Sequence, residues 1–269
     1  LADGDGIRID ASGAAVTNQS VGLITGGTGI YASAGGSGVV NAGRIKATFN
    51  GVYLLHGGSV TNLAGGTIGA AYGVHAVGAA ATGVNAGSLS GSADAVLQGA
   101  GFANRVVVDP GAAFSGKVDG GNTLGSSIVS TLELASGATA GTLSGIGTQF
   151  VDFGQVTVDS GARWTWAGAN TIGAGVTVSN HGTLTAAGTL TNAGSITGNG
   201  ITLAAGSELY NGAGGRITNL SGNAVIATGG GTVVDAGTLI GGSDAVSFAS
   251  GFANRMVLQA GAAITGTVD

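Results

Sequence analysis

The sequence predicts an all-β protein, a parallel β-helix or β-solenoid in which coils of about 21–27 residues stack on one another. Three observations favour this fold. The 269 residues include 57 glycines and one proline, and only 8% of the residues are charged. Val, Ile, Leu and Thr recur in short alternating runs, which place every second side chain on one face of a strand. The third observation is repetition at two scales, the signature of stacked repeats.

Alternative fold classes for a glycine-rich chain fit less well. Collagen needs glycine at every third position and abundant proline, and neither is present. Disordered chains lack the branched apolar residues that recur here. Helices are disfavoured because no segment has a sustained 3.6-residue apolar period, and each internal glycine costs a helix about 1 kcal/mol. A β-propeller stays open as an alternative, since two short units together have the length of one blade.

The long repeat joins residues 94–118 to residues 244–268, which share more than half of their residues at a constant offset of 150 positions. Both copies contain the string GFANR, at 101–105 and at 251–255. We therefore predict one continuous solenoid over residues 1–269 with a super-repeat of about 150 residues. Neither end resembles a solenoid cap, so we also expect the sequence to be a fragment of a longer chain.

A shorter pattern recurs inside the long one: an apolar residue, any residue, Asn or Asp, a small residue, Gly, any residue and an apolar residue. Most copies are 21 to 27 residues apart, and the rhythm tightens to about six residues between positions 180 and 220. Asn, Asp and Gly tolerate positive φ and predict a sharp turn after each strand. A unit of this size cannot bury its own apolar face, so the units must stack to form a core. The copies centre on Asn18, Asn41, Asn62, Asn85, Asp109, Asp159, Asn180 and Asp235.

The run LSGIGTQFVDFGQVTVDSGARW and the later GTLTNAGSIT resemble passenger segments of bacterial autotransporters and related very large β-strand-repeat surface proteins. The similarity is strongest over residues 90–269 and rests on a style of repeat, without a catalytic signature. It implies a right-handed parallel β-helix at the bacterial outer surface, with a role in adhesion, aggregation, biofilm or filament formation. Implied partners are host or matrix glycans and proteins. The uncapped ends add end-to-end stacking with other copies or adjacent solenoid segments.

Charge and hydropathy exclude two classes of partner. The net charge is −5, and the eight Lys and Arg residues are scattered, so we expect no nucleic-acid binding. No stretch of 18 apolar residues exists, so the sequence predicts no membrane span. The resemblance also implies an extracellular location at the bacterial outer surface.

Residues suited to catalysis or metal binding are few. His56, His75 and His181 have no second His or carboxylate at metal-ligand spacing, so we expect solvent-facing turn or loop residues. The chain has no cysteine and no G-x-S-x-G motif. A single DGDG string leaves calcium binding at Asp3 and Asp5 open beside ordinary turn formation. We predict a protein that is not an enzyme, with no catalytic, cofactor-binding or metal-binding residue.

The alternative function is that of a polysaccharide-active β-helix enzyme. Glycosidic bonds are cleaved by pairs of carboxyl groups, and a solenoid enzyme would gather them on adjacent coils. Asp109, Asp159 and Asp235 share one turn position instead. Turn formation accounts for these three residues without catalysis.

Two sets of side chains favour either a structural role or a ligand-binding face. Trp164 and Trp166 lie on one face of a strand, and we expect them to fill the core or cover an end; a platform for carbohydrate stacking is the alternative. Threonines alternate between residues 183 and 197, as they would on an ice-binding face. That face requires threonines stacked coil upon coil, which the six-residue rhythm does not clearly predict.

The repeated GFANR string has two interpretations. Phe102 and Phe252 are expected to fill a wide corner of the coil. Arg105 follows Asp94 by 11 residues, and the same spacing precedes Arg255, which favours a charge-assisted pair across that corner. The other interpretation is that duplication copied a solvated arginine, and neither interpretation requires a ligand.

Overall fold

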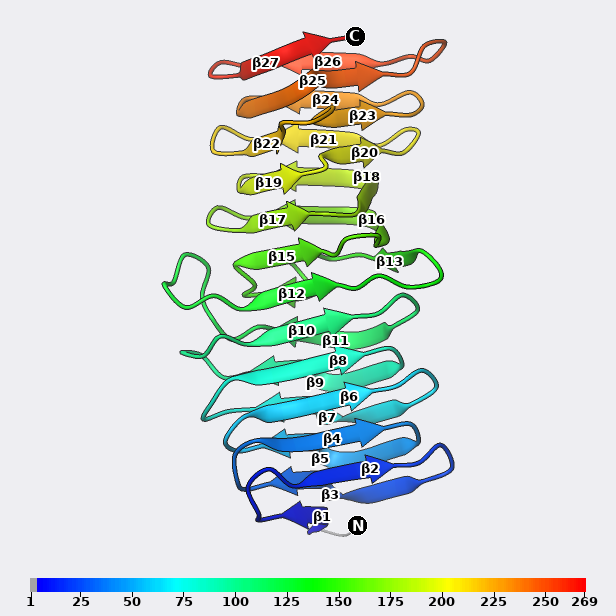
Figure 1. Ribbon diagram of the computed structural model, residues 1–269, viewed down its shortest axis with the longest axis vertical. Helices are drawn as coiled ribbons and strands as arrows, with labels where there is room; N and C mark the ends of the chain where they lie inside the picture. Colours follow the sequence, from blue (N-terminus) through cyan, green and yellow to red (C-terminus); the bar gives the residue numbers. More distant parts are fainter. Residues whose placement is uncertain (1–3) are drawn as a thin grey trace. The chain divides into compact units, whose positions relative to one another are not determined.

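The computed structural model describes residues 4–269, which form 27 strands and no helix (Figure 1). Strands of successive coils pair in parallel, and the fold is a β-solenoid of about 12 turns. The β-solenoid prediction is therefore confirmed, and the helical and propeller alternatives are wrong. Nothing in this part of the chain is a helix of the length and apolar character needed to cross a membrane. The chain divides into two compact units: Leu1–Glu133 with Gln149–Phe153 (unit 1), and Leu134–Thr148 with Gly154–Asp269 (unit 2).

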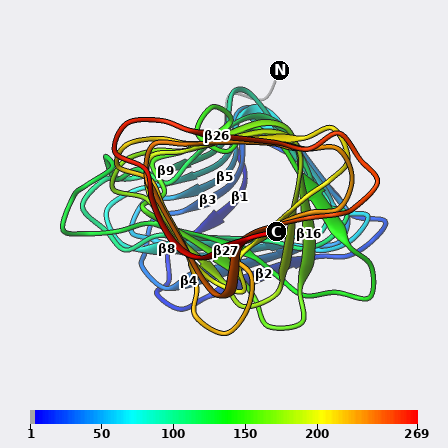
Figure 2. The same ribbon diagram turned by 90° about the horizontal axis from the view of Figure 1, so that it is seen from above.

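Unit 1 is built from two sheets of parallel strands. One sheet has the order β1-β3-β5-β7-β9-β11-β14, and the other contains β2, β4, β6, β8 and β10 in that order. Seen from above, β1, β3, β5 and β9 lie in one wall of the coil, and β2, β4 and β8 lie in another (Figure 2). Leu23 pairs with Arg44 and Ser88 with Ala113, so coils of 21 to 25 residues match the predicted length. The strands are β1 (Asp5–Ile9), β2 (Ala15–Asn18), β3 (Leu23–Ala32), β4 (Ser37–Asn41), β5 (Arg44–Leu54), β6 (Gly58–Asn62), β7 (Thr67–Ala76), β8 (Ala81–Asn85), β9 (Ser88–Gln98), β10 (Arg105–Val108), β11 (Ala113–Asp119), β12 (Thr131–Leu134, whose last residue belongs to unit 2) and β14 (Phe150–Val151).

Unit 2 contains shorter coils than the sequence predicts. Thr177 pairs with Ser195 and Thr189 with Glu208, so these coils have 18 and 19 residues. These short coils lie in the part of the sequence that has the six-residue rhythm. Short strands and short turns complete each coil there with fewer residues. The strands are β13 (Gly141–Leu143), β15 (Gln155–Val158), β16 (Arg163–Ile172), β17 (Thr177–Asn180), β18 (Thr183–Asn192), β19 (Ser195–Gly198), β20 (Ile201–Leu203), β21 (Glu208–Asn211), β22 (Arg216–Asn219), β23 (Val225–Ala227), β24 (Thr232–Asp235), β25 (Thr238–Phe248), β26 (Arg255–Leu258) and β27 (Ala263–Val268).

Aliphatic side chains stack along the inside of the coils. Ile45, Ile68 and Leu89 occupy paired positions on β5, β7 and β9, and each is at most 3% exposed. In unit 2, Trp164 and Trp166 are 2% and 0% exposed, which confirms the expected core role and excludes a carbohydrate platform. Trp164 also donates its Nε1–H to a backbone carbonyl at 2.9 Å. Burying each such side chain stabilises the fold by about 1.5–3 kcal/mol.

A ladder of buried asparagines runs through unit 1. Asn18, Asn41, Asn62 and Asn85 are each the last residue of a strand, and each is at most 5% exposed. The Nδ2 of each donates to the Oδ1 of the next, at 2.8, 2.8 and 2.9 Å. The strand-end amides therefore hold each coil to the next one.

A second ladder in unit 2 runs from Asn192 through Asn211 to Asp235, with donor–acceptor distances of 2.8 Å. These ladders correct the prediction that strand-end Asn and Asp residues make turns through positive φ. Within residues 4–269, Asp152 alone among non-glycine residues has a positive φ. An inward amide is favoured because it satisfies buried carbonyl groups that would otherwise lack a donor.

Candidate functional site

The exposed ammonium of Lys117 lies between two buried carboxylates of unit 1. Its Nζ donates to Asp119 Oδ2 at 2.8 Å and lies 3.6 Å from Asp94 Oδ1. Asp94 belongs to β9, and Lys117 pairs with it in register from the adjacent strand β11. Asp94 and Asp119 are only 9% and 8% exposed. The hydrogen bond to Asp119 raises the pKa of Lys117, so the ammonium form is favoured.

Asp152 brings a third carboxyl group to this cluster from the residue after β14. Its φ of 60° lies in the left-handed region, which is unfavourable for a residue with a side chain. Burial raises the pKa of Asp152, the Asp119 carboxylate raises it further, and Lys117 acts in the opposite direction. The cluster of Asp94, Lys117, Asp119 and Asp152, called the Lys117 cluster below, thus contains a carboxyl group that keeps its proton to higher pH than an ordinary aspartate.

The second copy of the long repeat lacks the ammonium. Asp244 of β25 and Thr267 of β27 stand where the first copy has Asp94 and Lys117, and the Thr267 hydroxyl donates to the Asp244 carboxylate. The strand pairing shifts register at this position in both copies, so the register shift does not require a lysine. Sequence reasoning missed Lys117, although the contrast with Thr267 between the two copies was a signal that could have found it.

Carboxyl groups of unequal proton affinity on adjacent coils are the components of general acid–base cleavage of glycosidic bonds. In the Lys117 cluster, Asp152 has the raised pKa of a proton donor, and Asp119 is paired with a cation. Across residues 4–269, no group of three His, Cys, Asp or Glu side chains could hold a metal ion. The chemistry that the carboxyl groups of this cluster could support is proton transfer.

The predicted pair between Asp94 and Arg105 is wrong. Arg105 forms a bidentate ion pair with Glu133, with Nη2–Oε1 and Nε–Oε2 distances of 2.5 and 2.8 Å. The physical reason is that stacking sets Arg105 beside β12 of the following coil, while Asp94 meets Lys117. The corner-filling role is also wrong for Phe252, which is 55% exposed, and Phe102 is only partly buried.

The asparagine of GFANR accounts better for the repeated string. Asn104 is 2% exposed, donates to the Gly99 carbonyl at 2.8 Å, and accepts from the Ala81 amide at 3.2 Å. In the second copy, Asn254 donates to the Ala249 carbonyl at 2.8 Å. The string thus recurs with a side-chain amide that fastens the turn between two strands.

The three histidines differ in their surroundings. His56 and His181 are exposed and lie outside the strands, as expected. The expectation is wrong for His75, which lies within β7, is half-buried, and stacks on Tyr53 with ring centroids 4.8 Å apart. Burial lowers the pKa of His75, and the neighbouring Asp94 carboxylate opposes this shift.

The turn aspartates have separate environments. Asp109 and Asp159 follow β10 and β15 and are partly buried, and burial raises the pKa of Asp109. Asp235 is fully buried at the end of the second ladder.

Of the two residues considered for calcium, Asp3 lies outside the described residues, and Asp5 Oδ2 lies 3.5 Å from an Arg8 nitrogen.

The threonines of β18 do not form a regular array. Thr185 stacks between Thr165 and Thr202 on the neighbouring strands. Thr189, in contrast, pairs with Ala169 on one side and Glu208 on the other. The interrupted rows do not provide the continuous threonine face that ice binding requires.

Comparisons of the chain with protein-family models, with curated proteins and with solved structures found no significant match. The β-solenoid fold is compatible with a β-helix repeat protein.

Proposed function

We propose that the chain is a structural and interaction segment of a bacterial cell-surface or secreted fibrous protein. In this role it acts outside the cell as a stiff spacer in adhesion, aggregation, biofilm or filament formation. Its partners are copies of itself and matrix or host glycans or proteins. The observation that carries the proposal is the pair of buried amide ladders. In both ladders the polar side chains at the strand ends form hydrogen bonds between successive coils.

The ladders favour a mechanical role through the order in which contacts must break. A coil leaves the stack only after its strand pairing and its ladder hydrogen bonds to the neighbouring coil are lost. These bonds are shielded from water, so each is stronger than its exposed counterpart. A chain pulled at its ends should therefore resist extension one coil after another.

Force spectroscopy on the full chain tests this mechanical role. Coils of 21 to 25 residues in unit 1 predict discrete lengthening steps, each of about 80 Å for a coil in the middle of that range. Extension without resolved steps would contradict the spacer role. Antibodies to the chain should also label intact cells that produce it, and protease treatment of those cells should remove the label. Labelling only after cell lysis would overturn the surface location.

A second candidate function is polysaccharide cleavage, and the Lys117 cluster is the observation that favours it. Incubation with linear neutral and acidic polysaccharides, followed by an assay for new chain ends, tests this candidate. Cleavage that Asp152→Asn abolishes would support catalysis at the cluster. Lys117→Thr, which copies the residue of the second repeat, tests whether the ammonium is needed. Intact polysaccharides after incubation would reject this candidate and leave the structural role standing.

A further inference from the structure

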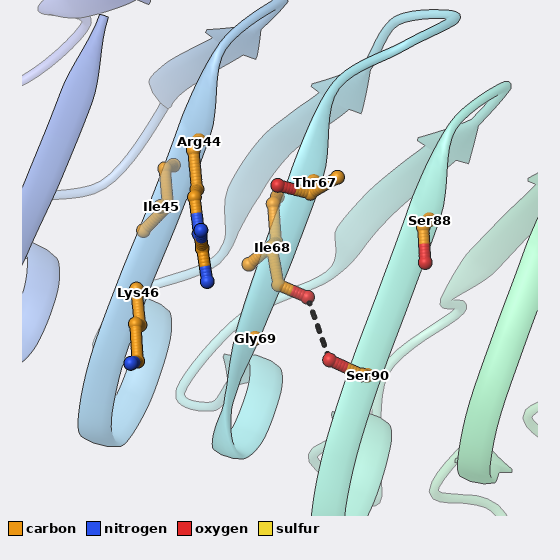
Figure 3. Close-up of a pocket in the computed structure, with 8 residues that line it drawn as sticks. All are labelled: Arg44, Ile45, Lys46, Thr67, Ile68, Gly69, Ser88 and Ser90. Carbon is orange, nitrogen blue, oxygen red and sulfur yellow. Dashed lines mark hydrogen bonds between the residues drawn. The ribbon is translucent and has the colours of Figure 1, made fainter.

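A pocket of about 370 Å³ lies on the outer face of unit 1, across β5, β7 and β9 (Figure 3). Arg44 and Lys46 line it from β5, Thr67 from β7, and Ser88 and Ser90 from β9. Both cationic side chains are exposed. The pocket therefore combines two positive charges with three hydroxyl groups, which are the donors that proteins use to bind oxyanions.

Arg44 and Lys46 differ from the other cations of unit 1. Arg8, Arg105 and Lys117 each form an ion pair with Asp or Glu. Among the residues that the structure describes, neither Arg44 nor Lys46 lies within 4.0 Å of a carboxylate. The whole chain carries a net charge of −5, so this pocket is a local concentration of unpaired positive charge on an acidic protein.

Strand register places the cations and hydroxyls in an ordered array. Arg44 and Lys46 are two positions apart on one face, at about 7 Å, and adjacent strands are about 4.8 Å apart. A single tetrahedral oxyanion can thus contact both long cationic side chains. Two rows cross the pocket in register: Arg44–Thr67–Ser88 and Lys46–Gly69–Ser90.

The missing side chain at Gly69 keeps the middle of the second row open. A Cβ added there would lie 2.8 Å from Ser90 Oγ. Gly69 is not among the positive-φ glycines, so its backbone conformation does not require glycine. Ser90 donates to the Ile68 carbonyl at a long 3.4 Å, which leaves its oxygen available to a ligand (Figure 3).

We propose that this pocket binds the sulfate or phosphate ester group of a sugar. The Arg44 guanidinium offers paired donors to the oxyanion, Lys46 supplies a second charge, and the hydroxyls bind the remaining oxygens and the sugar. The volume of about 370 Å³ falls in the range of small-molecule sites, about 300–1,000 Å³, and exceeds the needs of a lone inorganic ion. This ligand chemistry deepens the proposed interaction role and rests on it for its biological meaning.

Direct binding to the full chain tests the site without reference to mechanics or location. The probes are N-acetylglucosamine 6-sulfate, glucose 6-phosphate, inorganic sulfate and uncharged N-acetylglucosamine, titrated by NMR at low salt. We expect the two esters to bind, inorganic sulfate to bind more weakly, and the uncharged sugar not to bind. Binding of the esters should weaken at physiological salt, because exposed charges are screened there over about 8 Å.

Two variants and a control locate the binding. The double substitution Arg44→Ala with Lys46→Ala should weaken ester binding about tenfold or more. Gly69→Leu fills the pocket and keeps both charges, so it should abolish ester binding while inorganic sulfate still binds. Arg216→Ala removes an exposed arginine of unit 2 and should change nothing.

Several outcomes would overturn the proposal. Absence of ester binding, or ester binding unchanged in the double variant, would exclude the pocket as an oxyanion site. Inorganic sulfate binding as tightly as the esters would exclude recognition of the sugar. These outcomes are distinguishable from failure of the proposed spacer role, because force steps and cell-surface labelling do not depend on the ligand.

Discussion

Replacing one ladder asparagine by alanine should destabilise the whole fold. Asn62 is fully buried, accepts from Asn41 Nδ2 at 2.8 Å, and donates to Asn85 Oδ1 at 2.9 Å. Its Nδ2 also lies 3.1 Å from the Gly66 carbonyl oxygen and 3.2 Å from that of Ser88. The substitution Asn62→Ala removes all four interactions and leaves a polar gap between two coils.

The size of the loss follows from these bonds. The side-chain amide of Asn62 has two N–H bonds to donate and accepts one hydrogen bond, so about 1 kcal/mol for each gives a loss of about 3 kcal/mol in the free energy of unfolding. Neighbours that keep other partners reduce this figure, as Asn41 does through its bond to the Gly43 carbonyl at 3.1 Å. We therefore expect Asn62→Ala to cost about 2 kcal/mol. The matched control Asn199→Ala removes one exposed bond, to the Gly182 carbonyl at 2.9 Å, and should cost less than about 1 kcal/mol.

Urea unfolding followed by circular dichroism measures both variants. The midpoint of Asn62→Ala should fall with little change in the slope, since the surface exposed on unfolding is nearly the same. If Asn62→Ala were no less stable than Asn199→Ala, the ladder would not hold the coils together, and the spacer role would lose its main support.

Three further substitutions each probe a single ionisable side chain. Asp235→Asn should raise the free energy of unfolding by about 1–2 kcal/mol in urea titrations, because it replaces the buried, partnerless Asp235 Oδ2 by an NH2 group that can donate to a carbonyl of the next coil, as Asn211 Nδ2 does; an unchanged midpoint would contradict this. Asp152→Asn should stabilise the protein at neutral pH and lose this effect as the pH falls through the raised folded-state pKa of Asp152 towards the ordinary Asp value of 3.8, because that raised pKa makes ionisation unfavourable in the folded state. A pH-independent difference between Asp152→Asn and the parent would refute that cause. His75→Phe keeps the stacking on Tyr53 and should reduce the loss of stability on acidification below about the ordinary His value of 6.5, since the lowered pKa of His75 opposes protonation in the fold. Identical thermal melting profiles of His75→Phe and the parent across this pH range would count against it.

The solenoid was predictable because its causes are local in the sequence. Alternating apolar residues give Ile45, Ile68 and Leu89 their inward positions, and the recurrence of the pattern requires stacking. The burial of Trp164 followed from the same parity argument. The positions of Asn41 and Asn62 in the repeat were visible too, but a strand-end residue can turn inward or form the turn, and sequence alone does not choose.

The charged contacts were not predictable because they join different coils. Arg105 and Glu133 are 28 positions apart, while Lys117 meets Asp94 at a separation of 23. A change of one or two residues in coil length selects a different partner, and the coils vary in length. The Lys117 cluster also needs Asp152, which joins unit 1 from beyond a long intervening segment.

The amide ladders have a polarity that bears on how such a chain can be rearranged. Each Nδ2 points to the Oδ1 of the asparagine or aspartate that follows in the sequence, and the intervals are 23, 21 and 23 residues in unit 1, then 19 and 24 in unit 2. The ladder therefore needs one side-chain amide in each coil, and the number of residues in the coil can vary. A foreign sequence inserted between two ladder asparagines is compatible with the strand register as long as the next asparagine still reaches its hydrogen-bond partner. Such a chain is suited to gene-level shuffling of whole coils and to the display of inserted peptides along its side.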